Sequence, residues 1–167
     1  PCRCGIRGAD AEDAARTAAR KWRYHMIRRY KESDLPALMQ IWVDSNIEAH
    51  SFIPAEYWMD NFAAVKAALP RAEIYVHEDD DTKRADGFIG LNGEYIEGIF
   101  VEGNKRSMGI GKQLLDHVKK LKNELNLSVY RKNFRALSFY QRECFAVQSE
   151  SMDIDTGEAE VLMRWQI

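Results

Sequence analysis

Cysteine is scarce in this chain, because only three of its 167 residues are cysteines. Cys2 and Cys4 stand near the beginning, which leaves Cys144 as the single thiol of the remaining sequence. A disulfide framework needs several paired cysteines and an oxidising compartment, so the sequence does not indicate one. We therefore predict a cytoplasmic protein in which Cys144 is a structural thiol rather than a nucleophile.

Long apolar runs and clustered metal ligands are also missing. No apolar stretch approaches the roughly 20 residues that a membrane-spanning helix needs, so we predict no membrane partner. The four histidines are scattered, and no two of them stand at a metal-ligand spacing. We therefore predict no metal.

Positive charge is not in excess either. The chain carries 24 basic and 26 acidic residues, and residues 1–25 hold six of the basic and three of the acidic ones. The remainder therefore has 18 basic and 23 acidic residues, a net charge of −5. A nucleic-acid partner needs a basic face, so we expect no nucleic acid to bind. The acidic balance is compatible with a cationic amine as substrate.

Residues 1–25 differ in composition from the rest. They are rich in Ala and Arg, show no apolar stripe and lack the apolar core of a signal peptide. We interpret residues 1–25 as a non-native or disordered leader. Residues 26–167 are numerous enough for one domain with a hydrophobic core.

Three consecutive segments predict an antiparallel meander. Strands are expected at 73–77, 86–91 and 95–101, and Asn92-Gly93 is a strong hairpin signal between the last two. We also expect further elements, which are a strand at 26–30, helices at 33–49, 55–69 and 133–142, and strands at 145–152 and 160–165.

After strand 95–101 the pattern changes from strand to helix. Apolar residues recur at helical spacing from Ile110 to Leu125, which predicts a helix with one buried face. The next strand, 127–130, is reached through this helix, so it should run parallel to strand 95–101.

The turn before this helix contains Gly109 and Gly111. Glycines leave backbone N–H groups uncovered, and a helix N-terminus carries unpaired N–H donors and a partial positive charge. Arg106 adds a full charge and a forked donor. The turn therefore predicts an anion site, most plausibly for a phosphate or pyrophosphate, although a glycine pair that only makes a tight turn is the alternative.

Two familiar phosphate loops do not fit this turn. In a P-loop, Lys112 would be followed by Ser or Thr, but the next residue is Gln113. In a dinucleotide-binding fingerprint a third glycine would stand at Leu114.

The remaining pattern, Arg-x-x-Gly-x-Gly at 106–111, resembles that of the GCN5-related N-acetyltransferases (GNAT). The family also places an Asn after the next strand and a Tyr seven residues later, and this chain has Asn133 and Tyr140 there. Cys144 departs from the family, which usually has Gly before the aromatic residue now at Phe145. That position is expected to follow a helix end, where a small residue is tolerable. The likeness runs from about residue 26 to the end and is strongest to short, single-domain bacterial acetyltransferases.

The resemblance implies an α+β fold with α/β/α layers, the GNAT fold. Its sheet would be mixed and mostly antiparallel, with six to seven strands, a splayed parallel pair in the middle and about four helices. It also implies acetyl-CoA as cosubstrate, in the gap between the parted strands. The implied cofactor-binding residues are Ile99, Phe100, Val101, Arg106, Ser107, Met108, Gly109, Ile110, Gly111, Lys112 and Asn133.

The family's general-acid position is occupied by Tyr140, whose alternative is a core aromatic residue. Asn133 can equally be a helix cap. The general base is less clear, because the strand residue that is Glu in some family members is Ser128. Glu97 stands two residues before Ile99 in an otherwise apolar strand, so alternation places both on one face and makes Glu97 the candidate base. Glu94, at a turn, is a poorer choice.

The sequence says less about the acceptor site than about the cofactor site. The family's first helical pair lies over the acceptor mouth, which makes Phe52 and Tyr57 candidate acceptor-binding residues, with core packing as the alternative. We predict acetyl transfer to a primary amine, on a small molecule or a protein, by direct attack in a ternary complex. The rivals are a non-catalytic CoA-binding sensor and a nucleotide-phosphate binder. A monomer and a homodimer both remain possible.

Overall fold

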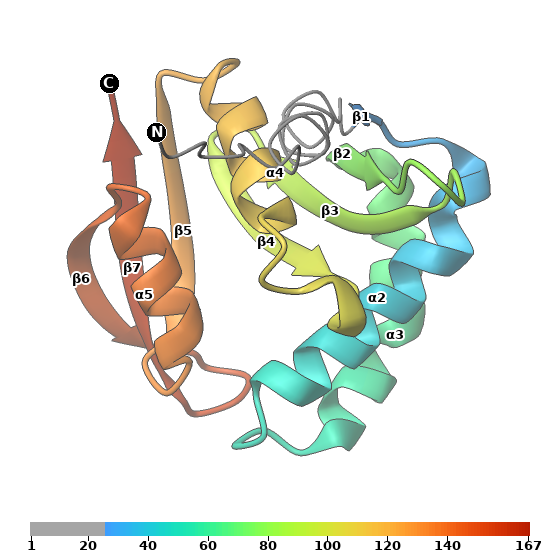
Figure 1. Ribbon diagram of the computed structural model, residues 1–167. Helices are drawn as coiled ribbons and strands as arrows, with labels where there is room; N and C mark the ends of the chain where they lie inside the picture. Colours follow the sequence, from blue (N-terminus) through green and yellow to red (C-terminus); the bar gives the residue numbers. More distant parts are fainter. Residues whose placement is uncertain (1–25) are drawn as a thin grey trace, which may run out of the picture.

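The computed structural model describes residues 26–167, and the predicted leader at 1–25 lies outside them. Within residues 26–167 a single seven-stranded sheet has the order β1-β2-β3-β4-β5-β7-β6 (Figure 1). The strands are β1 (Met26–Arg29), β2 (Glu73–Glu78), β3 (Ala85–Asn92), β4 (Tyr95–Val101), β5 (Glu124–Tyr130), β6 (Ala146–Met152) and β7 (Ala159–Gln166). The α-helices are α2 (Leu35–Ala49), α3 (Ala55–Ala68), α4 (Ile110–Lys119) and α5 (Phe134–Arg142). For residues 26–167, the predicted mixed sheet and the predicted number of helices are confirmed.

The central pair of strands is the one parallel pair of this sheet. All other neighbours run antiparallel, including the predicted meander β2-β3-β4. β4 and β5 are paired at one register position, Tyr95 with Asn126, and diverge beyond it (Figure 1). The predicted splayed parallel pair is therefore present, and the edge of β4 that faces β5 is free of strand pairing beyond Tyr95.

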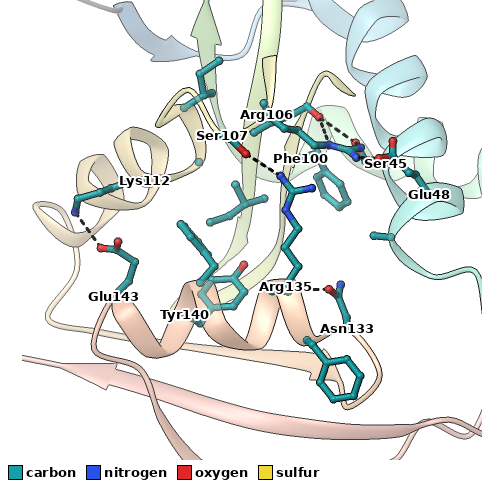
Figure 2. Close-up of a pocket in the computed structure, with 18 of the residues that line it drawn as sticks. Ser45, Glu48, Phe100, Arg106, Ser107, Lys112, Asn133, Arg135, Tyr140 and Glu143 are labelled. Atoms are coloured by element: carbon teal, nitrogen blue, oxygen red, sulfur yellow. Dashed lines mark hydrogen bonds and ion pairs between the residues drawn. The ribbon is translucent and has the colours of Figure 1, made fainter. Parts of the chain in front are cut away.

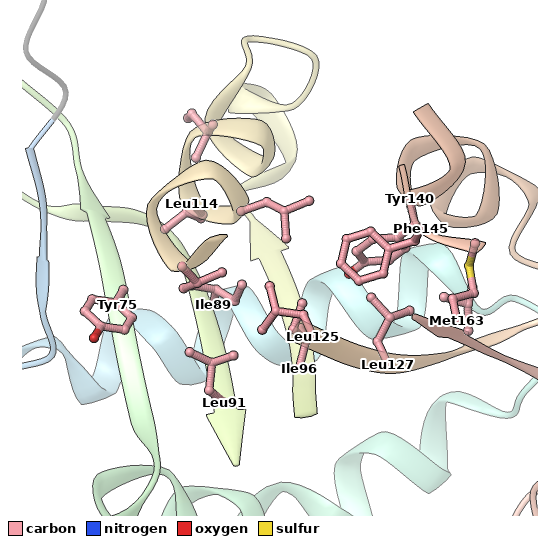
Figure 3. Close-up of a cluster of buried hydrophobic side chains, with 14 of the residues drawn as sticks. Tyr75, Ile89, Leu91, Ile96, Leu114, Leu125, Leu127, Tyr140, Phe145 and Met163 are labelled. Atoms are coloured by element: carbon pink, nitrogen blue, oxygen red, sulfur yellow. The ribbon is translucent and has the colours of Figure 1, made fainter. Parts of the chain in front are cut away.

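Helices cover the two faces of the sheet and form two apolar cores. α4 and α5 contribute to one core, in which Leu114, Leu125 and Met163 are fully buried (Figure 3). α2 and α3 contribute to the other core, with Leu38 and Val76 fully buried. Burying aliphatic side chains of this size stabilises the fold by about 1.5–3 kcal/mol each. The α4 stripe thus fixes the helix, and its N-terminus, firmly on the sheet.

The predicted helix from Ile110 to Leu125 is too long. α4 ends at Lys119, Leu121 is half exposed, and Leu125 belongs to β5. Leu125 continues the helical spacing of α4, but it also begins the alternation Leu125, Leu127, Val129, whose members are all buried. β5 pairs with β7 along its whole length, and these strand hydrogen bonds favour the alternating strand pattern over the helical spacing at Leu125.

A β-bulge in β4 corrects the predicted face of Glu97. Gly98 is opposite Gly90 and Ile96 is opposite Leu91, which leaves Glu97 without a partner in the β3 ladder. The extra residue reverses the alternation, so Ile96 and Ile99 both pack on the α4 side. The expectation that Glu97 shares the face of Ile99 is therefore wrong.

Among residues 26–167, no helix combines the length and apolar character needed to cross a membrane. The same stretch of the chain holds no group of three or more His, Cys, Asp or Glu placed to hold a metal ion.

Candidate functional site

A cavity of about 810 Å³ lies where the C-terminal end of β4, the N-terminus of α4, the helix α5 and the last turns of α2 meet (Figure 2). All the predicted cofactor-binding residues line it except Met108, whose side chain is exposed. Tyr140 lines it as well. The structure thus brings together residues from separate segments of the sequence.

The N-terminus of α4 is open towards this cavity. Gly109 is the N-cap, with a φ of +87°, and no side chain caps the helix. The first helical hydrogen bond runs from the Gln113 N–H to the Gly109 carbonyl at 3.0 Å, so the N–H groups of Ile110, Gly111 and Lys112 precede it. Ser107 also has a positive φ, +64°. Such a turn forms a concave set of donors that suits an anion.

Arg106 lines the cavity but is directed at α2. Its guanidinium forms an ion pair with Glu48, its Nη2–H donates to Ser45 Oγ at 3.4 Å, and its Nε–H donates to the Val101 carbonyl at 3.3 Å. Ser45 Oγ–H donates to the same carbonyl at 3.3 Å. Arg106 therefore fastens the turn to α2, and Glu48 offsets its charge.

Lys112 contributes its backbone rather than its charge. Its Nζ lies 2.9 Å from Glu143 Oε2 (Figure 2). The same Nζ lies 3.0 Å from Asp116 Oδ1. The hydrogen bond to Glu143 and then that to Asp116 raise the pKa of Lys112. This contact ties α4 to the C-terminal end of α5 and closes one side of the cavity.

Arg135 is a cavity residue that sequence reasoning missed. It reaches from α5 across the cavity, and its Nη2–H donates to Ser107 Oγ at 3.3 Å (Figure 2). The sequence did contain a signal for this role. A positive charge in the first turn of a helix is unfavourable next to the helix dipole, so an arginine at this position indicates a function other than stabilising the helix.

Asn133 is the N-cap of α5. Its Oδ1 accepts a hydrogen bond from the Ala136 N–H at 3.1 Å, which establishes the capping role. Its Nδ2 lies 3.2 Å from His50 Nε2. Burial lowers the pKa of His50 to about 4, so the imidazole is neutral and its Nε2 can accept this hydrogen bond. The pair joins α2 to α5.

Tyr140 is buried, yet its hydroxyl points into the cavity (Figure 2). Its ring packs against Phe139 and Phe145, with centroids 5.1 and 5.4 Å away. The Phe145 N–H donates to the Tyr140 carbonyl at 3.0 Å, and Cys144 between them has a φ of +66°, as the prediction of a helix end there requires. Burial, with a smaller contribution from Tyr95, raises the pKa of Tyr140, so the phenol keeps its proton at neutral pH.

Tyr95 stands at the point where the two central strands separate. The Ser128 N–H donates to the Tyr95 hydroxyl at 3.1 Å. The Tyr95 side chain therefore satisfies a β5 backbone N–H at a position where β4 and β5 are no longer paired. Tyr95 also lies near enough to Tyr140 to contribute to the raised pKa of that residue.

Three other predicted residues lie outside the cavity. Glu97 lines a second cavity, which Phe100 also borders. Phe52 and Tyr57 pack at the margin of the α2–α3 core. Phe52 contacts His50 and Tyr130, with centroids 5.7 Å from each. Their predicted roles as base and acceptor contacts stay predictions.

Comparison with known proteins agrees with this geometry. The family model described as "Acetyltransferase (GNAT) domain" matches residues 70–145. The peptidyl-lysine N-acetyltransferase YiaC of Escherichia coli is 33% identical over 144 residues, which cover 85% of this chain and 97% of YiaC. The peptidyl-lysine N-acetyltransferase YjaB of the same organism is 30% identical over 132 residues, covering 79% of this chain and 89% of YjaB.

Solved structures show the same fold. The solution structure of apo YjaB from Escherichia coli has a TM-score of 0.75 at 27% identity, covering 84% of this chain and 96% of YjaB. A Bacillus anthracis protein that is named a streptothricin acetyltransferase was solved in complex with acetyl coenzyme A. Its structure has a TM-score of 0.52 at 21% identity, and the match covers 57% of this chain and 62% of the Bacillus anthracis chain. The fold, the relatives and the family model together place the chain in the GCN5-related N-acetyltransferase family, and the protein is an N-acetyltransferase.

Proposed function

We propose that this enzyme transfers the acetyl group of acetyl-CoA to a primary amine in a ternary complex. One observation carries the proposal: the bare N-terminus of α4 and the protonated hydroxyl of Tyr140 open into the same cavity. The relatives named peptidyl-lysine N-acetyltransferases support a lysine side chain as the acceptor class.

The residues present fit a CoA thioester. The N–H groups of Ile110, Gly111 and Lys112, with Arg135 on the opposite wall, would hold the diphosphate. The unpaired edge of β4 at Ile99 and Phe100 offers backbone groups to an amide-containing arm. When bound, acetyl-CoA supplies an acetyl group activated as a thioester.

Side chains of the protein accept and donate the protons that the reaction transfers. A lysine ammonium has a pKa of about 10.4 and is not a nucleophile, so a base must take one of its protons. We assign this step to Glu97, directly or through water. Tyr140 keeps its proton until the C–S bond breaks and, as the general acid, then gives it to the departing thiolate and regains one from solvent.

Thiol release tests this function. With acetyl-CoA and a lysine-containing peptide, the full chain should release CoA and acetylate the peptide, as mass spectrometry would show. CoA should raise the melting temperature, whereas ATP and NAD should not. A melting temperature that responds to ATP or NAD and not to CoA would favour the nucleotide-phosphate binder. CoA binding without turnover on any amine would favour the sensor.

A further inference from the structure

His50 stands directly after α2 and lines the same cavity as Tyr140. Its ring stacks on that of Trp58 in α3, with centroids 5.2 Å apart and planes inclined by 29°. The rings of Phe52 and Tyr130 lie nearly perpendicular to it, with centroids at 5.7 and 5.1 Å. Three aromatic rings, from the α2–α3 connection, α3 and β5, therefore hold the imidazole in one orientation at the edge of the cavity.

The contacts of Asn133 identify which of its atoms faces His50. The Ala136 N–H can only donate, so the atom of Asn133 that it meets at 3.1 Å is the amide oxygen Oδ1. The amide nitrogen Nδ2 then lies 3.2 Å from His50 Nε2. An amide nitrogen can only donate, so Nε2 is the acceptor. Burial lowers the pKa of His50 to about 4 and thereby keeps the ring in the neutral form that this contact needs.

The Asn133 amide therefore has one N–H left over. An amide nitrogen carries two hydrogens, and His50 accepts only one of them. Within residues 26–167, Nδ2 makes no other hydrogen bond, and Asn133 lines the cavity. Because the Ala136 N–H holds Oδ1 and His50 holds Nδ2, the amide is fixed at both ends. It presents a donor of set direction on the wall that faces the unpaired edge of β4.

We propose that His50 is a positioning residue for the cofactor, which fixes the Asn133 amide so that its remaining N–H donates to a carbonyl of the amide-containing arm of CoA. The inference rests on the acetyltransferase function above and deepens it. His50 acts through Asn133 and does not touch the reacting atoms. Its loss should therefore weaken the binding of CoA and leave the chemical step at Tyr140 nearly intact.

Two substitutions of His50 separate positioning from packing. His50→Gln keeps an acceptor near the place of Nε2 but loses the ring that stacks on Trp58, whereas His50→Phe keeps a ring and loses the acceptor. Positioning predicts that His50→Phe raises the Kd of CoA about fivefold, in the range of one lost hydrogen bond, and that His50→Gln stays close to the wild type. A packing role predicts the opposite order. Titration calorimetry measures the Kd.

Steady-state kinetics gives a second readout. The KM of acetyl-CoA should rise in His50→Phe with kcat nearly unchanged. His117→Phe is the matched control, because His117 is also half-buried and packs on an aromatic ring, that of Tyr75 at 4.6 Å, but does not line the cavity. It should leave both constants as in the wild type.

A fragment of the cofactor tests which part of it the amide meets. Adenosine 3′,5′-bisphosphate lacks the amide-containing arm, so His50→Phe should bind it as the wild type does while binding CoA more weakly. An equal loss of affinity for both ligands would overturn the assignment to the arm.

A double-mutant cycle tests whether His50 acts through Asn133. Asn133→Ser keeps a capping oxygen and removes the amide nitrogen. In the Asn133→Ser background, His50→Phe should cause no further loss of CoA affinity, because the two residues belong to one contact. Additive losses would show that His50 acts on the cofactor by another route and would overturn the inference.

The outcomes separate this inference from the proposed function. If the wild type binds CoA and acetylates a lysine peptide, but His50→Phe binds CoA as tightly as His50→Gln or more tightly, the ring has a packing role only and the function stands. If the wild type neither binds CoA nor releases it from acetyl-CoA with any amine, the function itself fails.

Discussion

The N-termini of α4 and α5 face the same cavity but are built in opposite ways. At α4 the N-cap is Gly109, with a left-handed backbone and no side-chain cap, so the helix leaves its first donors open. At α5 the N-cap is Asn133, whose side chain satisfies the Ala136 N–H within the protein. The N-terminus of α4 therefore has free N–H donors for an external anion, whereas the protein itself caps the N-terminus of α5.

This difference shows how the two walls divide the work. α4 contributes backbone groups, so most of its side chains are free to pack on the sheet or face solvent. α5 contributes side chains, namely Asn133, Arg135 and Tyr140, each at a defined position along the helix. Substitutions should therefore act on α4 through backbone conformation and on α5 through the loss of particular atoms.

The largest effect is expected on the α5 wall. Tyr140→Phe removes the one hydroxyl that this helix directs at the cavity and keeps the ring that packs on Phe145. We expect kcat to fall by about 10²- to 10⁴-fold, the usual range for a lost acid or base, with the KM of acetyl-CoA nearly unchanged. Steady-state thiol release measures both constants.

Tyr75→Phe is a matched control for this substitution. Tyr75 is also buried, but its hydroxyl donates to Glu73 at 2.9 Å outside the cavity. It should change stability only. An unchanged kcat in Tyr140→Phe would show that Tyr140 is a core residue and would leave the α5 wall without a chemical role.

A smaller effect is expected from the backbone of α4. Gly109→Ala places a Cβ on a residue with a φ of +87°, which costs about 1–2 kcal/mol in the left-handed region. We expect the turn to shift its N–H groups and the affinity for CoA to fall about tenfold, a loss of about 1.4 kcal/mol, as titration calorimetry would measure.

Gly157→Ala separates strain from binding. Gly157 has a similar φ of +71° with nothing within 4 Å of an added Cβ, and it lies in the β6–β7 connection. Both variants should lose similar stability, but only Gly109→Ala should lose CoA affinity. Equal CoA affinity in the two would mean that the α4 end does not hold the diphosphate.

The sequence predicted the features that depend on local spacing. The glycines of the turn, Asn133 and Tyr140 lie in short segments whose positions along a strand or helix follow from counting residues. The strand β4 itself and its parallel relation to β5 also followed, because a helical connection constrains the strand direction.

Features that depend on distant partners were not accessible in this way. The face of Glu97 is set by a bulge against Gly90 and Leu91, which no local pattern in β4 reveals. The direction of Arg106 depends on Glu48, which stands on α2, far earlier in the chain. The end of α4 was misplaced because Leu125 satisfies both a helical and a strand period.

A more modest effect is expected at the cap of α5. Asn133→Ala removes the acceptor of the Ala136 N–H and should lower the free energy of unfolding by about 0.5–2 kcal/mol. Asn133→Ser retains a capping oxygen but lacks the amide group that contacts His50. Urea unfolding should rank the variants wild type, Ser, Ala. A CoA affinity that falls equally in both variants would assign the Asn133 amide to the cofactor as well.

The smallest effect concerns the pH dependence of this contact. Burial lowers the pKa of His50 from 6.5 to about 4. Below about pH 6.5 the unfolded chain binds a proton that the folded chain rejects, so stability falls as the pH drops from 6.5 towards 4 and is not reduced above that window. The loss should reach about 1–3 kcal/mol, since each pKa unit corresponds to about 1.4 kcal/mol and partial exposure reduces it.

His50→Gln keeps an acceptor for Asn133 but cannot be protonated, so its stability should change less between pH 6.5 and 4.5. Urea unfolding at several pH values measures the two slopes. Carboxylates with a lowered pKa, such as Asp34 beside Arg28, act in a more acidic window and do not obscure the comparison. Equal slopes would show that His50 is solvated in the folded protein, and the connection from α2 to the capped end of α5 would then be open to water, as the α4 end is.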